Sequence, residues 1–450
     1  MKQIKKKPQS RISRSRRNLF LISLVFLFLK LILIFSVKNG AWLGADGESY
    51  IKGADGLLRD GFLSKEGVLT YWPAGYPILI WFFVLITSLH FSVLLSIFQT
   101  VIYFAAVAFF AEKLRQSRFN ELAMPVAFIL AIDPTLTLSS MAIGYESLVA
   151  SALLLTLSCI MHAQQNPDKK TLIKAVVGVG LLQGFASFLQ PRTIIFGVAI
   201  LIIWIIRIDS RKTQAIVLTG GLFLLAIFPA TLIFRNLEAN GVATISNNLG
   251  INMIMGAGDK ATGGYGNSGA VVCLPKKSSA IVSDNQKVTC VLAWYLKHPT
   301  KSLHLALNKS VYFWSPWYGP LANGTMARNP WLKINPLVNM ASSVQGRNLV
   351  FGAFGKVVSW IWLLSGLGLF FYGWIWLWQS QKEGRMLALL CGTPVVLAWL
   401  TAIGTFGDHR FRLPTMGLSL FLQVAGSIRL KQRISGAFQA PTLDPRGKRR

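Results

Sequence analysis

The sequence has little negative charge and lacks the motifs that mark several classes of soluble enzyme. Only 17 of its 450 residues are Asp or Glu, against 46 Lys or Arg. It contains no Walker A, HExxH, CxxC or GxSxG motif. Nucleotide hydrolysis by a P-loop, zinc proteolysis and serine esterase chemistry therefore have no support in the sequence.

The sequence is instead rich in apolar residues, which make up 53% of the chain and give a mean hydropathy of +0.49. Apolar segments of about 17 to 25 residues, long enough to span a bilayer, recur from one end to the other. They predict an all-α polytopic membrane protein with about ten transmembrane helices. The predicted spans are Leu19 to Val37, Val93 to Ala111, Leu122 to Leu138, Ser147 to Ala163, Ile173 to Phe188, Ile194 to Ile206, Ala215 to Phe234, Val357 to Trp378, Met386 to Ile403 and Leu413 to Ile428.

The net charge of +29 would suggest nucleic acid as the partner of a soluble protein, but its distribution argues against this. The basic residues are concentrated in two tails, 1–18 and 429–450, and in short loops beside the spans. With a cytoplasmic N-terminus, alternation of the spans puts these loops on the cytoplasmic side, as the positive-inside rule requires. The loop residues are Lys113, Arg115, Arg118, Lys169, Lys170, Arg207, Arg211, Lys212, Lys382 and Arg385. We therefore expect a multi-pass protein of the plasma (inner) membrane, with both termini cytoplasmic and no nucleic-acid partner.

The first apolar run follows a basic tail, so a cleaved signal peptide is an alternative interpretation. The run is long, and Asn39 to Leu43 provides no small-x-small cleavage site. An uncleaved anchor that forms the first span fits the sequence better.

The spans divide the chain into an N-terminal membrane module, 19–234, and C-terminal transmembrane helices, 357–428. The first outer loop, 38–92, contains the short apolar stretch Ile78 to Leu89, which predicts an interfacial or re-entrant helix. The mixed, Gly- and Asn-rich segment 235–356 predicts an extracytoplasmic cap. Cys273 and Cys290 lie in this cap and could form a disulfide in an oxidising compartment or remain free thiols.

The few acids at the outer ends of the spans are the candidate catalytic residues. Asp46 and Glu48 follow the first span, and Glu146 begins the fourth. A carboxylate at this position could act as general base toward an acceptor hydroxyl. Each acid could instead only cap a helix or balance its dipole. Glu146 is the stronger functional candidate of its kind because it lies between apolar stretches, where an ionised group is costly.

Arginines at the same outer ends are candidates for binding a departing phosphate. Arg192, Arg235 and Arg410 each lie where a predicted span begins or ends on the outer side. A guanidinium group matches the geometry of a phosphate and stabilises developing negative charge. The alternative is that these arginines only anchor helix ends to lipid headgroups.

The order of these motifs resembles one family along the whole chain, from the first span to the last. The first loop begins with acid-x-x-x-Tyr, Asp46 to Tyr50, and closes with Pro-x-Gly-Tyr-Pro, Pro73 to Pro77. Later motifs are Pro134 with Glu146, Pro191-Arg192, Arg235-Asn236 with Gly241 and a Gly/Asn-rich turn, and Gly-Asp-x-Arg-Phe-Arg-x-Pro from Gly407 to Pro414. The chain resembles the membrane-embedded GT-C glycosyltransferases, and most closely the branch of protein O-mannosyltransferases and the aminoarabinose transferase of lipid A. One departure is Gly47, where an acid often follows the first Asp in that branch; Glu48 is the candidate replacement.

The resemblance implies an inverting transfer of a sugar from a polyprenyl-phosphate carrier to an acceptor hydroxyl on the extracytoplasmic face. In that scheme Asp46 is the base, and Glu146 orients the acceptor or the base or belongs to a metal site. Arg192, Arg235, Arg410 and Arg412 would hold the phosphate. The acceptor could be a lipid, a glycan or a protein. We expect no cofactor, and we do not favour a divalent metal because no compact ligand set is apparent.

Two other functions remain open from the sequence. A lipid or sugar transporter or flippase would also suit a polytopic chain, but it should show two related halves and charges near the bilayer midplane. No internal repeat is apparent, and the acids lie at the ends of spans. A non-catalytic scaffold protein is the third possibility, and it predicts that Asp46 is dispensable.

Overall fold

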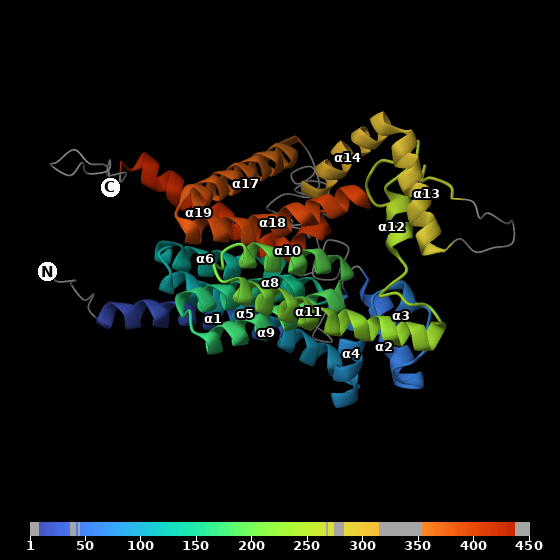
Figure 1. Ribbon diagram of the computed structural model, residues 1–450, viewed down its shortest axis with the longest axis horizontal. Helices are drawn as coiled ribbons and strands as arrows, with labels where there is room; N and C mark the ends of the chain where they lie inside the picture. Colours follow the sequence, from blue (N-terminus) through green and yellow to red (C-terminus); the bar gives the residue numbers. More distant parts are fainter. Residues whose placement is uncertain are drawn as a thin grey trace.

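The computed structural model describes residues 9–36, 42–43, 46–266, 269–273, 283–314 and 353–436. These residues form an elongated bundle of roughly aligned helices (Figure 1). The first described helix begins, and the last one ends, at the same end of the bundle. We call this the basic end. The opposite end, which we call the site end, carries several shorter helices.

Seven helices among the described residues are long and apolar enough to cross a membrane, which indicates an all-α membrane protein. They are α1 (Gln9–Ser36), α5 (Phe91–Gln116), α8 (Glu146–Gln165), α9 (Lys169–Leu189), α11 (Arg211–Asn240), α17 (Ala353–Gln379) and α18 (Lys382–Gly404). Each of them coincides with one of the ten predicted spans. The other three predicted spans take different forms.

The predicted span Leu122 to Leu138 is interrupted. Helix α6 (Asn120–Ile132) ends before Pro134, and a separate helix α7 (Pro134–Ser139) follows. Proline lacks a backbone donor and disfavours helical geometry in the residue before it. The Asp133 carboxylate accepts a hydrogen bond from Leu136 N at 2.9 Å and so caps α7.

The predicted spans Ile194 to Ile206 and Leu413 to Ile428 also differ from the structure. Helix α10 (Ile194–Ile205) has only 12 residues, about 18 Å, and follows the 3-10 turn η1 (Pro191–Thr193). The region around Pro414 is the 3-10 turn η5 (His409–Thr415), so α19 (Met416–Ile434) starts later than predicted. The last turn of α19 contains Lys431 and Arg433, which makes this helix less apolar than the seven long ones.

Helix α8 lies inside the bundle, whereas α1 and α17 lie at its periphery. In the apolar window of α8, 83% of residues are buried, against 17% in α1 and 22% in α17. The peripheral helices expose large apolar side chains such as Phe28 and Trp362, which are 62% and 63% exposed. Such continuous apolar exposure fits contact with lipid.

The connections at the basic end come together although they are far apart in sequence. Arg118, after α5, forms an ion pair with Glu383 at the start of α18, with 3.3 Å between Nε and Oε2. Gln432 near the end of α19 donates to Glu121 of α6 at 2.9 Å. The predicted basic loops therefore do lie at one end of the bundle.

The site end carries the segments that the sequence predicts as the first outer loop and the cap, and we keep these two names for them. The loop contains α2 (Gly47–Asp60), α3 (Val68–Tyr71) and α4 (Gly75–Ile86), and the cap contains α12 (Leu249–Met255), α13 (Asp284–Lys297) and α14 (Pro299–Trp314). The predicted interfacial stretch corresponds to α4, a short apolar helix. The part of the predicted cap from 315 to 352 lies outside the described residues.

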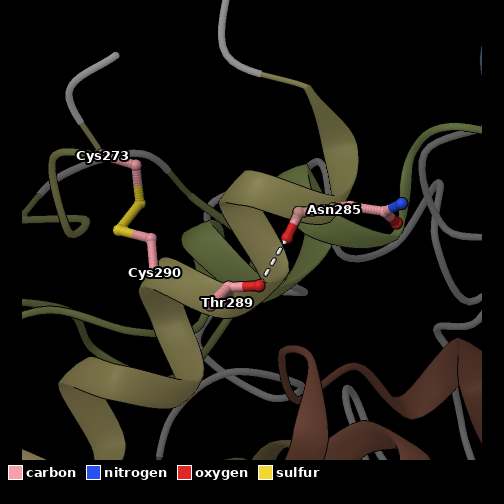
Figure 2. The surroundings of a disulfide bond; sticks show 4 residues. All are labelled: Cys273, Asn285, Thr289 and Cys290. Carbon is pink, nitrogen blue, oxygen red and sulfur yellow. Dashed lines mark hydrogen bonds between the residues drawn. A yellow bond between two sulfur atoms is a disulfide. The ribbon is translucent and has the colours of Figure 1, made fainter. Parts of the chain in front are cut away.

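The cap has its own small core and a disulfide. Met253, Trp294 and Leu305 pack together from its three helices. Cys273 is joined to Cys290 of α13, 17 residues later (Figure 2). The structure thus pairs the two cysteines for which the sequence left pairing open. Cys159 and Cys391 are free.

Candidate functional site

A short parallel strand pair brings the first outer loop to the start of α8. Strand β1 (Trp42–Leu43) pairs with β2 (Ala142–Ile143), with Trp42 opposite Ala142. Three residues after each strand comes an acid, Asp46 in the loop and Glu146 at the first position of α8. Backbone pairing therefore places side by side two carboxylates that lie about one hundred residues apart in the sequence.

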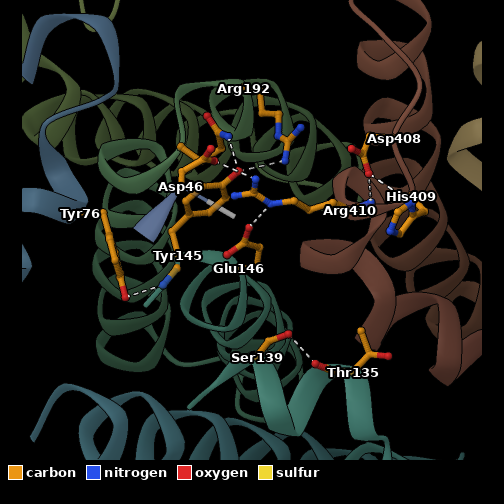
Figure 3. Close-up of polar contacts among 12 residues, drawn as sticks. Asp46, Tyr76, Thr135, Ser139, Tyr145, Glu146, Arg192, Asp408, His409 and Arg410 are labelled. Carbon is orange, nitrogen blue, oxygen red and sulfur yellow. Dashed lines mark hydrogen bonds and ion pairs between the residues drawn. The ribbon is translucent and has the colours of Figure 1, made fainter. Parts of the chain in front are cut away.

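Arg410 bridges these two carboxylates. Its Nη1 lies 2.8 Å from Asp46 Oδ2, and its Nε donates to Glu146 Oε1 at 2.6 Å (Figure 3). Burial alone would lower the pKa of Arg410, but the carboxylates of Glu146 and Asp46 outweigh it and raise that pKa well above its usual value. Arg410 therefore stays charged and fixes both acids.

The turn that carries Arg410 is itself fixed by Asp408. Asp408 Oδ1 accepts a hydrogen bond from Arg410 N at 2.8 Å and lies 3.3 Å from His409 Nδ1. Asp408 is the acid of the Gly-Asp-x-Arg motif, and it caps the 3-10 turn η5. The motif thus has a local structural role, because Asp408 stabilises the turn that places Arg410 next to Asp46 and Glu146.

The two acids are not equivalent in their exposure. The Glu146 side chain is 3% exposed, whereas that of Asp46 is 20% exposed. Asp46 Oδ1 has no hydrogen-bond partner among the described residues. Asp46 can therefore meet a bound molecule, whereas Glu146 acts on the site only through Arg410.

Arg192 contacts Tyr145, whose ring centre also lies 5.9 Å from the guanidinium carbon of Arg410. Arg192 Nη2 donates to the Tyr145 hydroxyl at 3.4 Å, and its guanidinium carbon lies 4.2 Å from the centre of the Phe411 ring. Gln190 donates to the same hydroxyl at 2.7 Å. Arg192 forms no ion pair within the described part of the chain, so its charge is available to an anion.

The Pro-x-Gly-Tyr-Pro motif supports the start of α8 from below. The Tyr76 hydroxyl accepts from Gly144 N at 2.8 Å and donates to Gln99 Oε1 at 3.0 Å. Gly75 packs against the Phe188 carbonyl so closely that any side chain would collide with it. At Gly144 an added Cβ would lie 2.5 Å from Glu146 Oε2, so this glycine leaves room for the carboxylate.

These residues line a cavity of about 630 Å³, which we call the site cavity. Its polar lining includes Asp46, Gln190, Arg192, Asp408, His409 and Arg410, and its aromatic lining consists of Tyr50, Trp72, Tyr145, Tyr265, Phe406 and Phe411. Seven residues between Thr244 and Met253, together with Tyr265, line it from the cap side. The volume lies within the range of about 300 to 1,000 Å³ that is usual for ligand sites.

Four predicted site residues do not line this cavity. Glu146 is held beside it by Arg410, and the other three lie in other parts of the molecule. Glu48 is exposed on α2, because it is two residues beyond Asp46 and the helix turns it to another side. Arg412 is two residues beyond Arg410 and donates instead to Trp314 O at 3.0 Å. The structure thus brings Asp46, Glu146, Arg192 and Arg410 together, whereas Glu48, Arg235 and Arg412 lie elsewhere.

Arg235 has a different set of partners from the one expected. It is fully buried and donates to the carbonyls of Phe62 and Ser64 and, at 2.7 Å, to Asn236 Oδ1. Its guanidinium also lies 3.4 Å from Thr70 Oγ1. Arg235 therefore ties the first outer loop to α11 and does not reach the site cavity.

Sequence reasoning missed the positioning roles of Tyr145 and Gln190. Both lie next to residues that were selected, Glu146 and Pro191-Arg192, and this adjacency was the only available signal. The part played by Tyr265 could not be predicted, because the Gly-rich stretch that contains it has no periodicity.

No group of three or more His, Cys, Asp or Glu residues that could hold a metal ion occurs among the described residues. The space between Asp46 and Glu146 is taken by the Arg410 guanidinium. No known protein family, curated protein or solved structure matches this chain. The site geometry is therefore the main basis for inferring a function.

Proposed function

We propose that this protein is an inverting glycosyltransferase of the GT-C type, which moves a sugar from a polyprenyl-phosphate carrier to an acceptor hydroxyl. The observation that carries the proposal is the arrangement of Asp46, Arg410 and Arg192 around one cavity. An accessible carboxylate lies there beside a cation that fixes it, and a second cation, which forms no ion pair with any described residue, contacts Tyr145. A base and an anion-binding group in one cavity are the two elements that this transfer needs.

In the proposed reaction Asp46 takes the proton of the acceptor hydroxyl. The acceptor oxygen forms a bond to the anomeric carbon of the sugar while the bond from that carbon to the phosphate oxygen breaks. The electron pair leaves with polyprenyl phosphate, and the configuration at the anomeric carbon inverts. Arg410 holds Asp46 Oδ2, so the other carboxylate oxygen, Oδ1, is free to receive the proton.

Arg192 is the proposed ligand of the departing phosphate. Its guanidinium stacks on Phe411, which orients the group without using up its charge. A guanidinium binds phosphate oxygens through charge-assisted hydrogen bonds, which strengthen as negative charge develops on the leaving group. The aromatic residues of the site cavity suit the faces of a sugar ring and the first isoprene units.

The charge distribution supports an extracytoplasmic site. The basic loops lie at the end of the bundle opposite the site cavity, and such loops are enriched on the cytoplasmic side of membranes. The proposed location is the plasma (inner) membrane, with both termini in the cytoplasm. A transporter or flippase is less well supported, because α8 separates the two ends of the bundle with a buried and mostly apolar stretch.

The test is turnover by purified protein with a panel of polyprenyl-phosphoryl sugars and a membrane extract as the acceptor source. We expect Asp46→Asn to release polyprenyl phosphate at least about 100-fold more slowly than wild type, the usual effect of losing a general base. The matched control is Asp55→Asn, which removes an exposed carboxylate from α2 in the same loop.

A separate binding experiment distinguishes an unsuitable sugar from an incorrect proposal. It measures the binding of polyprenyl phosphate as a rise in melting temperature. We expect wild type and Asp46→Asn to bind it, and Arg192→Gln to bind it about tenfold more weakly, as for the loss of one charged hydrogen bond. Full turnover by a folded Asp46→Asn protein would remove Asp46 from the mechanism. No binding of polyprenyl phosphate to wild type would refute the donor class.

A further inference from the structure

The basic end of the bundle contains a second cavity, of about 410 Å³, which we call the far cavity. Four segments contribute to it: the end of α5, the end of α8, the residues after α10 and the start of α18. Its charged lining consists of Arg118, Arg207, Lys382 and Glu383. Three cations and one acid leave this cavity with net positive charge.

The far cavity and the site cavity lie a membrane thickness apart. Helix α8 begins at Glu146, beside the site cavity, and ends at Gln165, which lines the far cavity. Its 20 residues extend over about 30 Å, the thickness of the hydrocarbon core of a bilayer. The far cavity therefore lies at the level of lipid headgroups on the other surface.

Two side chains that line the far cavity have a buried atom without a hydrogen-bond partner, Gln165 at Oε1 and Arg207 at Nε, and Arg207 is the one that carries a charge. Its Nε is buried without a hydrogen-bond acceptor, and its guanidinium forms no ion pair with any residue the structure describes. Arg118, by contrast, is paired with Glu383 at 3.3 Å. A buried N–H donor without an acceptor is costly, and the oxygens of an anion would supply the missing acceptor.

The surface next to Arg207 is apolar. Ile202 of α10 and Ile206, which directly follows this helix, are 44% and 65% exposed. The bound molecule would thus have an anionic group at Arg207 and could have an apolar part along α10. A free phosphate would satisfy Arg207 equally well but would gain nothing from this apolar surface.

We propose that the far cavity binds the phosphate of an anionic phospholipid, with its acyl chains against α10. Basic pockets between membrane helices on the cytoplasmic side are suited to such headgroups, and the surrounding basic loops would concentrate anionic lipid there. Arg207 and Lys382 would contact the phosphate oxygens. This assignment does not depend on the proposed transferase activity.

The experiment measures lipid retained by the detergent-purified protein in native mass spectrometry. Phosphatidylglycerol is compared with phosphatidylcholine of identical acyl chains, and inorganic phosphate is added separately while the melting temperature is followed. We expect preferential retention of phosphatidylglycerol, and about tenfold weaker retention by Arg207→Gln. The matched control is Arg211→Gln, an exposed cation at the same end outside the cavity lining, with less than about a twofold effect.

Equal retention of phosphatidylglycerol by wild type and Arg207→Gln would overturn the proposal, as would equal retention of the two lipids by wild type. Stabilisation by inorganic phosphate as large as that by phosphatidylglycerol would identify a free anion as the ligand and overturn the lipid assignment. If Arg207→Gln does not fold, Lys382→Gln replaces it, with weaker retention of phosphatidylglycerol as the expected result and unchanged retention as the contrary one.

Discussion

Two arginines, Arg235 and Arg410, differ in what neutralises them, and this difference predicts different roles for them. Arg410 faces two carboxylates beside the site cavity. Arg235 faces backbone carbonyls and neutral side chains, with no carboxylate among its described partners. Its role is therefore to hold a loop, not to bind substrate.

This contrast predicts that Arg235→Gln destabilises the protein without a specific loss of donor binding. The shorter neutral side chain would leave the carbonyls of Phe62 and Ser64 without a donor in a buried place. We expect the free energy of unfolding to fall by about 3 kcal/mol, measured by thermal melting in detergent. The control Arg59→Gln, which breaks an exposed ion pair with Glu66, should cost less than about 1 kcal/mol. If Arg235→Gln melts like wild type but no longer binds polyprenyl phosphate, the prediction is wrong and Arg235 binds the phosphate.

Among the elements, the contact between α14 of the cap and the end of α18 depends on a buried lysine. Lys309 is 1% exposed, and its Nζ donates to the Tyr295 hydroxyl at 2.7 Å and to Ile403 O at 2.8 Å. A cation at the C-terminal end of α18 is favoured by the helix dipole. Its burial nevertheless lowers the pKa of Lys309 to about 7.

The lowered pKa predicts that stability rises with pH. In the unfolded chain the Lys309 amine keeps its proton up to about pH 10, whereas the folded protein releases it near pH 7. The unfolded state thus binds more protons between about pH 7 and 10, so the folded state gains up to about 1.4 kcal/mol per pH unit in that window.

We expect the Lys309→Met variant to lose this pH dependence, measured as melting temperature at pH 7, 8 and 9. The control is Lys301→Met on the same helix, which removes an exposed lysine that pairs with Asp259. It should keep the wild-type slope. A slope in Lys309→Met equal to that of wild type would show that another group causes the dependence.

For the whole molecule, the separation of charge between the two ends predicts its orientation in the membrane. Asn166, after α8, is exposed at the basic end, and Glu238, near the end of α11, is exposed at the site end. In a background without the free Cys159 and Cys391, we expect a membrane-impermeant maleimide to label Glu238→Cys in intact cells. Asn166→Cys should react only after permeabilisation. The reverse result would place the site cavity on the cytoplasmic side.

The sequence predicted the long helices well because the length of an apolar run is a local property. Helices such as α5 and α11 coincide with their predicted spans. The predicted span Leu122 to Leu138 is wrong at Asp133-Pro134, because the apolar run continues through the proline whereas the helix does not. The span-end acids Asp46 and Glu146 were also identified locally. Their separation by about one hundred residues did not prevent this, because alternation of spans returns each loop to the same side.

The direction of a side chain at the end of a span was not predictable in the same way. Arg192 and Arg235 both lie at span ends, yet one lines the site cavity and the other binds the outer loop. Arg410 and Arg412 are two residues apart and point to different neighbours. Such differences depend on tertiary packing and on the 3-10 turn η5, neither of which has a local sequence pattern.

The buried helix α8 has a consequence for how the chain can vary. Glu146 lies at one end of this helix and Gln165 at the other. The helix therefore fixes both the distance between these two side chains and the angle between them about the helix axis. Inserting one residue in its middle would rotate one half against the other by about 100°. Glu146 and Gln165 could not then both keep their neighbours, so α8 should tolerate exchanges of side chains but no change in its length.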